Sequence, residues 1–320
     1  MAVLPGVTTE IVAGFHDGET GFLKSLRRCD GALVLAPEEE GILERLARTV
    51  VRRGRLLIGP GPRAVRLAAD KRETARCLVA HGVPVPAGMV VPRRGAAGRL
   101  RRLKPPFVLK PRDGCGCQGV SIVRAPSDVL SALRRMDGVS RRRDLLVEEY
   151  LTGEPASVSV LVSRGKDSVK TAPPLCLALN RQVLIGRGSL RYAGGVTPFF
   201  HPAGREALRL AARAVEAVAE STGDLCGYVG VDLVLAPGGP RVVEINPRLT
   251  TSYLGLRRLT RANLAGLMID AALGRRLPRR VGIAGSCSFR PDGSVTVRNA
   301  RPVTGRPWRS TAVGTSAAST

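Results

Sequence analysis

The chain has 320 residues, of which 44% are hydrophobic and only 3% aromatic. This composition excludes an intrinsically disordered protein, and it predicts a core of Val, Leu, Ile and Ala, as in proteins with buried strands and covering helices. The formal net charge of +24 suggests that the protein could bind nucleic acid. The arginines are spread along the whole chain, however, which favours a solvated arginine-rich surface.

The first part of the chain predicts a small α/β lobe. Strand-like runs at 31–36 and 55–58 flank a segment with helical spacing at 38–53, and one long helix is expected from Arg63 to about Ala80. Gly82 and Pro84 then end that helix in the usual way. We therefore place a lobe boundary near residue 87, so that residues 1–87 form the first lobe.

The next segment, residues 88–152, predicts a small α+β lobe. It holds a strand at 107–110, a glycine-rich loop at 111–119, a strand at 120–123, a helix near 127–137 and a strand at 145–149.

Residues 153–303 predict the largest lobe. Strands are expected at 157–162 and 175–185, a polar glycine-containing loop at 186–198, and a helix with an apolar face at 205–221. The strands 228–235 and 241–246 flank APGGP, which predicts a hairpin. A helix near 261–273 and a hairpin at 284–297 follow, and residues 304–320 are expected to be a disordered tail.

The predicted hairpin carries three oxygen ligands. Glu244 and Asn246 point to the same face of one strand, and the turn brings Asp232 opposite or diagonal to them. Such an oxygen-only set suits Mg²⁺ (or Mn²⁺) with water and phosphate completing the shell. The other interpretation is a solvent-facing polar edge, but both acids interrupt apolar runs, where an unpaired charge is expensive to bury.

Two further motifs fit a nucleotide. Lys110 ends a strand just before Gly114, Gly116 and Gly119, so that its ammonium could meet phosphates that the loop backbone also approaches, although a plain surface hairpin fits the same pattern. The run VEEYLTGE offers backbone groups to an adenine edge and carboxylates to ribose hydroxyls. Its candidates are Glu148, Glu149 and Glu154, which could equally be exposed glutamates at a strand end.

Together these motifs resemble the ATP-grasp superfamily in order and spacing. The residues that carry the resemblance are DK at 70–71, VLKP at 108–111, the GCGCQG loop, VEEYLTGE at 147–154, GVDLVL at 230–235 and VEINPR at 243–248. The resemblance implies a mixed α/β and α+β chain with the ATP-grasp fold and a shortened N-terminal pre-ATP-grasp lobe. The usual first strand and helix of that lobe are expected within residues 1–30, so either the lobe is trimmed or its start is misassigned.

The resemblance also implies roles for single residues. Lys71 and Lys110 would contact the phosphates of ATP, Glu148, Glu149 and Leu151 would surround the adenine, and Glu154 would bind the ribose. Asp232, Glu244 and Asn246 would hold two Mg²⁺ ions, with Arg248 near the γ-phosphate and the acyl-phosphate as the catalytic cation. The implied reaction joins a carboxylate to an amine with release of ADP and phosphate.

The segment RYAGGVTPF at 191–199 resembles the acceptor-side loop of tyramine–glutamate ligases, which act in methanofuran-type cofactor assembly. In this interpretation Arg191 pairs with a substrate carboxylate and Tyr192 contacts a ring, with Gly194 and Gly195 in the same loop, although a flexible polar loop explains the segment as well. The alternatives are an ATP-grasp ligase of another substrate class and a basic nucleic-acid-binding protein, against which scarce aromatics and the lack of a binding motif argue.

The location and partners follow from simple features. The first twenty residues carry three acids and no long apolar run, no segment reaches transmembrane length, and the seven cysteines lack paired spacing. We therefore expect a cytoplasmic protein that binds small molecules, without a membrane or nucleic-acid partner. A homodimer is left open.

Overall fold

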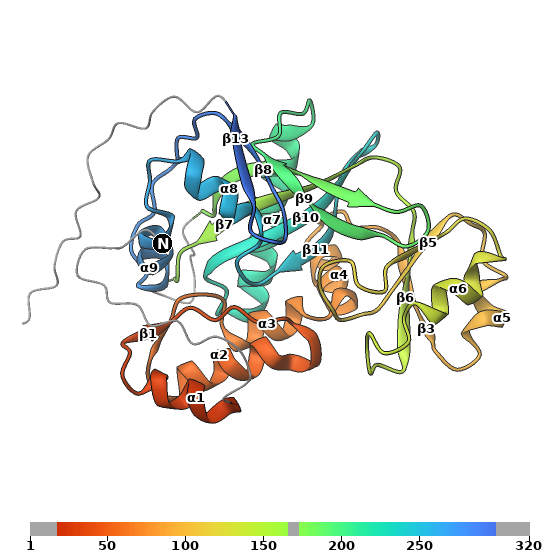
Figure 1. Cartoon of the computed structure of the whole chain (residues 1–320), viewed down its shortest axis with the longest axis horizontal. Coiled ribbons are helices and arrows are strands. Elements are labelled where there is room, and N and C mark those ends of the chain that lie inside the picture. The colour runs from red at the N-terminus through yellow and green to blue at the C-terminus, as the bar shows by residue number, and fades with distance from the viewer. Residues whose placement is uncertain (1–17, 166–172, 299–320) are drawn as a thin grey trace, which may run out of the picture.

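The computed structural model describes residues 18–165 and 173–298, which form three adjoining lobes, each with its own sheet (Figure 1). The expected tail at 304–320 lies outside the described residues. Within the described ranges no helix is long and apolar enough to cross a membrane.

The N-terminal lobe is built mainly from helices. Its elements are α1 (Gly18–Leu26), β1 (Gly31–Ala32), the short 3-10 helix η2 (Glu39–Gly41), α2 (Ile42–Arg52), β2 (Leu56–Leu57), α3 (Pro62–Ala68) and α4 (Lys71–Ala80). The strands β1 and β2 pair in parallel, and both are shorter than expected.

The prediction of one helix from Arg63 to Ala80 is wrong, because the chain forms α3 and α4 instead. Asp70 stands between them in an extended conformation, and its carboxylate accepts hydrogen bonds from the backbone N–H groups of Arg72 and Glu73. This N-cap satisfies donors that a continuing helix would have bonded internally. As a result Lys71 occupies the first position of α4 and is buried.

The small lobe is a four-stranded antiparallel sheet with two helices. Its elements are β3 (Gly88–Pro92), α5 (Ala96–Leu100), β4 (Phe107–Lys110), β5 (Ser121–Val123), α6 (Asp128–Arg134) and β6 (Asp144–Glu149), and the strand order is β3-β6-β4-β5. Strand β6 is therefore central, which buries Glu148 between β3 and β4.

The largest lobe is a seven-stranded antiparallel sheet with helices on both faces. Its elements are β7 (Glu154–Val162), β8 (Leu175–Ile185), β9 (Arg191–Thr197), α7 (Gly204–Thr222), β10 (Gly227–Ala236), β11 (Gly239–Asn246), α8 (Ser252–Leu259), α9 (Leu264–Ala272), β12 (Ser286–Phe289) and β13 (Val295–Arg298). The strand order is β11-β10-β7-β8-β9-β12-β13.

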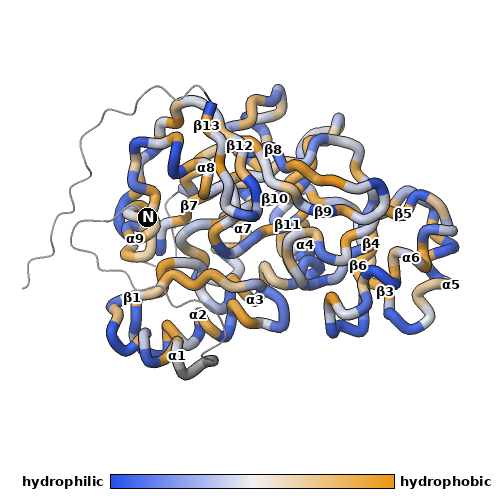
Figure 2. The backbone as a smooth tube through the Cα atoms, in the orientation of Figure 1, coloured by the Kyte–Doolittle hydropathy of each residue, from blue (hydrophilic) through white to orange (hydrophobic). Residues whose placement is uncertain are grey.

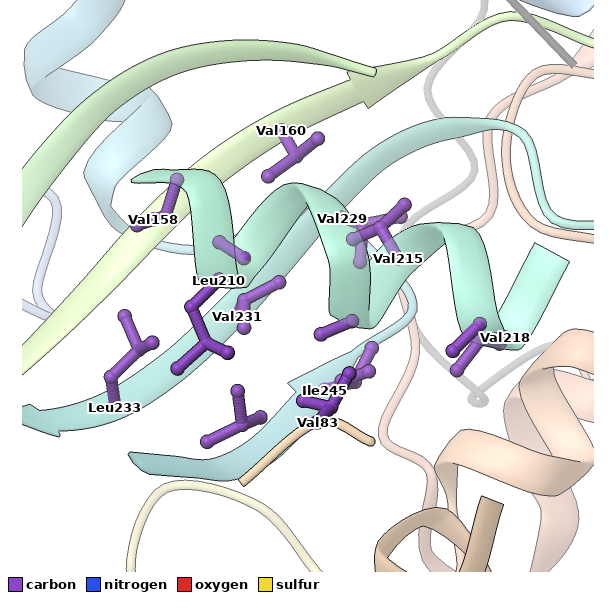
Figure 3. Close-up of a cluster of buried hydrophobic side chains, with 14 of the residues drawn as sticks. Val83, Val158, Val160, Leu210, Val215, Val218, Val229, Val231, Leu233 and Ile245 are labelled. Atoms are coloured by element: carbon purple, nitrogen blue, oxygen red, sulfur yellow. The ribbon is translucent and has the colours of Figure 1, made fainter. Parts of the chain in front are cut away.

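Alternation along the central strands gives this sheet two different faces. Figure 3 shows Val158, Val160, Val229 and Val231 in one cluster with the buried side chains of α7. The intervening side chains point to the opposite face, where Ser157, Ser159 and Asp232 lie at adjacent register positions. Figure 2 shows that hydrophobic residues are concentrated in the inner strands and hydrophilic ones in the outer loops. The face beneath α7 is thus core, whereas the opposite face packs against α8 and α9 in one part and carries polar side chains around Asp232 in another.

The predicted loop at 186–198 is wrong for most of its length, because residues 191–197 form strand β9 between β8 and β12. A Cβ atom at Gly194 would lie 2.1 Å from the Phe289 carbonyl oxygen, and one at Gly195 would lie 2.5 Å from the Arg181 carbonyl oxygen. The glycines that suggested a loop are there because neighbouring strands approach too closely for a side chain.

Candidate active site

A cavity of about 320 Å³ opens between the small lobe, the glycine-rich loop and the seven-stranded sheet. It gathers eight of the residues singled out in the sequence, namely Lys71, Lys110, Gly114, Glu148, Glu149, Leu151, Asp232 and Glu244. These residues come from segments more than 170 positions apart, and only the folding of the lobes against each other places them around one space. The cavity has the size and mixed lining of a small-molecule site.

The hairpin of β10 and β11 supplies the acidic side of the cavity. Asp232 lies directly opposite Glu244, and Gly230 lies opposite Asn246, so Asp232, Glu244 and Asn246 share one face. Asn246 and Gln182 hydrogen-bond to the Asp232 carboxylate. Burial and the nearby Glu244 raise the pKa of Asp232 to about 7, because a second negative charge at this place is costly without a cation.

These three residues fit a divalent cation of the hard, oxygen-binding kind. Two carboxylates and an amide oxygen on one face are the donor set that Mg²⁺ accepts when water and phosphate supply the remaining positions. In the described residues no group of three or more His, Cys, Asp or Glu side chains is placed to hold a metal ion by itself.

Lys71 joins the acidic side to the glycine-rich loop. Its Nζ donates to the Gly114 carbonyl oxygen at 2.7 Å and lies 3.0 Å from Glu244 Oε1. Burial alone would lower the pKa of this lysine, but the charge and hydrogen bond of Glu244 outweigh it and raise the pKa. The ammonium is thus a fixed positive charge between the loop and the carboxylate pair.

A second buried lysine lies on the small lobe. Lys110 ends β4, and its Nζ is 2.7 Å from Glu148 Oε2, with both side chains less than a tenth exposed. The two other glutamates of the VEEYLTGE run are differently placed. Glu149 is exposed and its carboxylate accepts from the Ala87 N–H, while Glu154 lies within 4.0 Å of both Arg181 and His201.

The glycine-rich loop covers the cavity. Gly114, Gly116 and Gly119 all have positive φ angles, which is the conformation that glycine adopts without strain. The two cysteines between them are half-buried, and burial raises the pKa of Cys115 to about 11 and that of Cys117 to about 12. They are therefore protonated, weakly reactive thiols at neutral pH.

Arg248 follows the hairpin and is held by a residue that the sequence analysis did not single out. Its Nε lies 2.8 Å from Glu38 Oε1, and Glu38 is only 5% exposed. Glu38 comes from the N-terminal lobe, directly before η2. The one signal for it in the sequence is a run of three glutamates, which by itself resembles an exposed helix start.

The four residues expected on the acceptor side lie in β9 and do not line the cavity. Arg191 is exposed, Gly194 and Gly195 pack against neighbouring strands, and the Tyr192 hydroxyl lies 2.6 Å from Thr251 Oγ1. Burial raises the pKa of Tyr192 to about 12, and the Asp232 carboxylate adds to the shift.

Apart from Leu151, the sequence analysis assigned no role to the apolar residues that line the cavity. They include Pro86, Val108, Ile122, Leu184, Leu190, Leu233 and Val243. The turn between β8 and β9 closes one side, since the Gly188 carbonyl accepts from the Ile122 N–H at 2.8 Å and Leu190 N–H donates to Val120. Apolar side chains on opposing strands form a slot that suits a flat heterocycle next to the charged end.

Comparison with protein families places both parts of the chain. The family described as an ATP-grasp domain matches residues 68–252, and the family described as a pre ATP-grasp 3 domain matches residues 2–65. A tyramine–L-glutamate ligase of Methanocaldococcus jannaschii is 30% identical over 264 residues, covering 81% of this chain and 69% of the relative. A D-alanine–D-alanine ligase of Gloeobacter violaceus is 27% identical over 238 residues, covering 69% of this chain and 72% of the relative.

Among solved structures, a putative ATP-grasp superfamily protein from Archaeoglobus fulgidus has a TM-score of 0.59 and 29% identity. The match covers 84% of this chain and 71% of the other.

Proposed function

Because this chain belongs to the ATP-grasp family, we propose that it uses ATP to activate a substrate carboxylate as an acyl-phosphate, which an amine then attacks with release of ADP and phosphate. The observation that carries the proposal is the cavity in which Asp232 faces Glu244 beside two buried lysines. Acids for a metal, cations for phosphates and an apolar slot for a base occur there in one continuous space.

The charged end of the cavity would bind the triphosphate and its metal. Asp232, Glu244 and Asn246 would hold Mg²⁺ or Mn²⁺, which supplies neutralisation of charge on the transferring phosphoryl group when bound. Lys71 and Lys110 would donate to phosphate oxygens, and Gly114, Gly116 and Gly119 would let the loop backbone approach them.

The apolar slot would hold the base of ATP. Glu148, Glu149 and Leu151 border the slot at the end of β6, with the backbone of this segment available to an adenine edge. Glu154 would bind the ribose, in exchange for its present contacts with Arg181 and His201.

The reaction requires positioning and electrostatic stabilisation more than a nucleophilic side chain. A substrate carboxylate would attack the γ-phosphate in line, and the amine would displace phosphate from the resulting mixed anhydride. Arg248 would stabilise the negative charge of the transferring group and of the acyl-phosphate. The glycine-rich loop would exclude water, which would otherwise hydrolyse this anhydride.

For the substrates we propose an amino acid such as L-glutamate as the acid and tyramine as the amine, which are the compounds in the name of the M. jannaschii relative. Such a ligase would serve methanofuran-type cofactor biosynthesis. Arg191 would pair with a free carboxylate of the glutamate, and Tyr192 would contact the aromatic ring of tyramine. Gly194 and Gly195 would let the backbone of β9 come close to the substrate. The cytoplasmic location and a homodimer stay predictions.

The test is release of ADP and phosphate from Mg²⁺-ATP with a panel of amino acids and amines that includes L-glutamate with tyramine. We expect release only when an acid and an amine are both present, and its loss in Asp232→Asn. A matched control is Glu220→Gln, since Glu220 is exposed on α7. Formation of AMP, or normal turnover of Asp232→Asn, would contradict the proposal.

A further inference from the structure

Three consecutive glutamates of the N-terminal lobe reach three different parts of the molecule. Glu38 contacts Arg248 beyond the hairpin, Glu39 accepts a hydrogen bond from the backbone N–H of Cys115 at 3.3 Å, and the Glu40 carboxylate lies 2.8 Å from Arg141 Nε in the small lobe. The last contact is on the surface, because the Arg141 side chain is 87% exposed. The first two lie at the edge of the candidate active site.

The contact of Glu38 differs from an ordinary surface ion pair. Glu38 is 5% exposed, and the Arg248 side chain is 19% exposed. Among the described residues no partner meets hydrogen-bond geometry for either Glu38 carboxylate oxygen or for Arg248 Nε, although the two groups are 2.8 Å apart. The Arg248 guanidinium is therefore the adjacent cation that compensates for burial of the Glu38 carboxylate, since a buried anion without a cation is strongly unfavourable.

The surroundings show what this contact prevents. Glu244 also attracts the Arg248 guanidinium electrostatically, and Glu38 and Glu244 both attract Lys71. Without Glu38, the Arg248 side chain would turn toward the carboxylate of Glu244, which also attracts it. The guanidinium would then neutralise a proposed metal ligand and leave the place where charge develops.

We propose that Glu38 is a positioning residue that holds the Arg248 guanidinium beside the hairpin and away from Glu244. The N-terminal lobe thereby contributes to the reaction centre through Arg248 without touching the substrate. This inference rests on the proposed function, because it assigns Arg248 to the γ-phosphate and the acyl-phosphate.

A double-mutant cycle tests whether Glu38 acts through Arg248. The variants are Glu38→Gln, Arg248→Gln and their combination, assayed with ATP, L-glutamate and tyramine. A misplaced catalytic group loses about 100-fold in rate, so we expect Glu38→Gln to lower kcat by that order. In the Arg248→Gln background, Glu38→Gln should have no further effect.

Two further variants separate positioning from folding. Glu38→Asp keeps the charge on a shorter side chain and should restore part of kcat, and it also serves if Glu38→Gln does not fold. Glu40→Gln removes the neighbouring surface contact and should behave as the wild type. An unchanged kcat in Glu38→Gln, or losses that multiply in the double variant, would overturn the inference.

A binding readout is independent of turnover. Calorimetry with Mg²⁺ and either AMP-PNP or ADP measures the preference for a γ-phosphoryl group, which Glu38→Gln, Arg248→Gln and the double variant should all reduce equally. If the wild type shows this preference but joins no acid to an amine, the proposed function fails while the pairing of Glu38 with Arg248 stands. Binding of neither nucleotide would overturn both.

Discussion

Replacing Lys110 by Met breaks the buried pair with Glu148 and gives a quantitative test of the site. The two charged atoms are 2.7 Å apart, which corresponds to a gross attraction of about 6 kcal/mol at an effective dielectric constant of about 20. Removing one partner of such a pair leaves a buried charge and typically costs about 3–5 kcal/mol. Because both residues border the cavity and water can reach it, we expect the lower end, about 3 kcal/mol, or about 150-fold in the folding equilibrium.

The assay is urea unfolding followed by circular dichroism, with Lys104→Met as the control, since Lys104 is exposed on the same lobe. The control should change the free energy of unfolding by less than about 0.5 kcal/mol. The double variant Lys110→Met with Glu148→Leu should recover most of the lost free energy of unfolding, because an apolar pair replaces both charges. A loss below about 1 kcal/mol in Lys110→Met, or no recovery in the double variant, would refute the reasoning.

Four more changes test other parts of the structure. Glu244→Gln should lower ADP release by about 100-fold or more and leave the circular dichroism spectrum intact, and normal turnover would refute the metal assignment. Burial raises the pKa of Cys117 to about 12. The rate at which iodoacetamide labels this thiol, measured by mass spectrometry, should therefore rise with the thiolate fraction, about tenfold per pH unit from about pH 7 to about pH 10. A plateau of the rate at about pH 9 would count against this pKa. The Asp224 carboxylate accepts hydrogen bonds from the first backbone N–H groups of α3. Asp224→Ala should therefore lower the free energy of unfolding by about 0.5–2 kcal/mol. An unchanged midpoint of urea unfolding would show that this cap is dispensable. Gly194→Ala would press a Cβ atom against the Phe289 carbonyl and should cost about 1–3 kcal/mol, so an unchanged melting temperature would contradict the close packing of β9.

The ATP-grasp fold that the sequence predicted is confirmed by the family match, which also includes a pre ATP-grasp domain at residues 2–65. Local sequence patterns were sufficient to predict an element wherever apolar and polar residues alternate along a strand or turn residues mark a hairpin. The run APGGP predicted the hairpin, and the observed register places Asp232 opposite Glu244 as one of the two expected arrangements. The register itself needed the structure, because β10 and β11 shift by a bulge after Asp232 that no sequence pattern announced.

Other features depended on contacts between distant segments. The glycines of β9 suggested a loop, yet close approach of Phe289 and Arg181 makes glycine the residue that a strand requires there. The helix expected to run from Arg63 to Ala80 ends early, because the Asp70 carboxylate caps a new helix and also binds Arg112 from the small lobe.

The sequence by itself determined which residues have the chemistry for a nucleotide and a metal, since residue type and strand periodicity are local properties. Only the tertiary structure decided which of them meet: it brought Lys71 to Glu244, placed Arg191 outside the cavity and added Glu38 from the N-terminal lobe. The physical reason is that a charge is stabilised or left unpaired by whatever lies within a few ångströms of it, and those neighbours come from parts of the chain that sequence spacing does not relate.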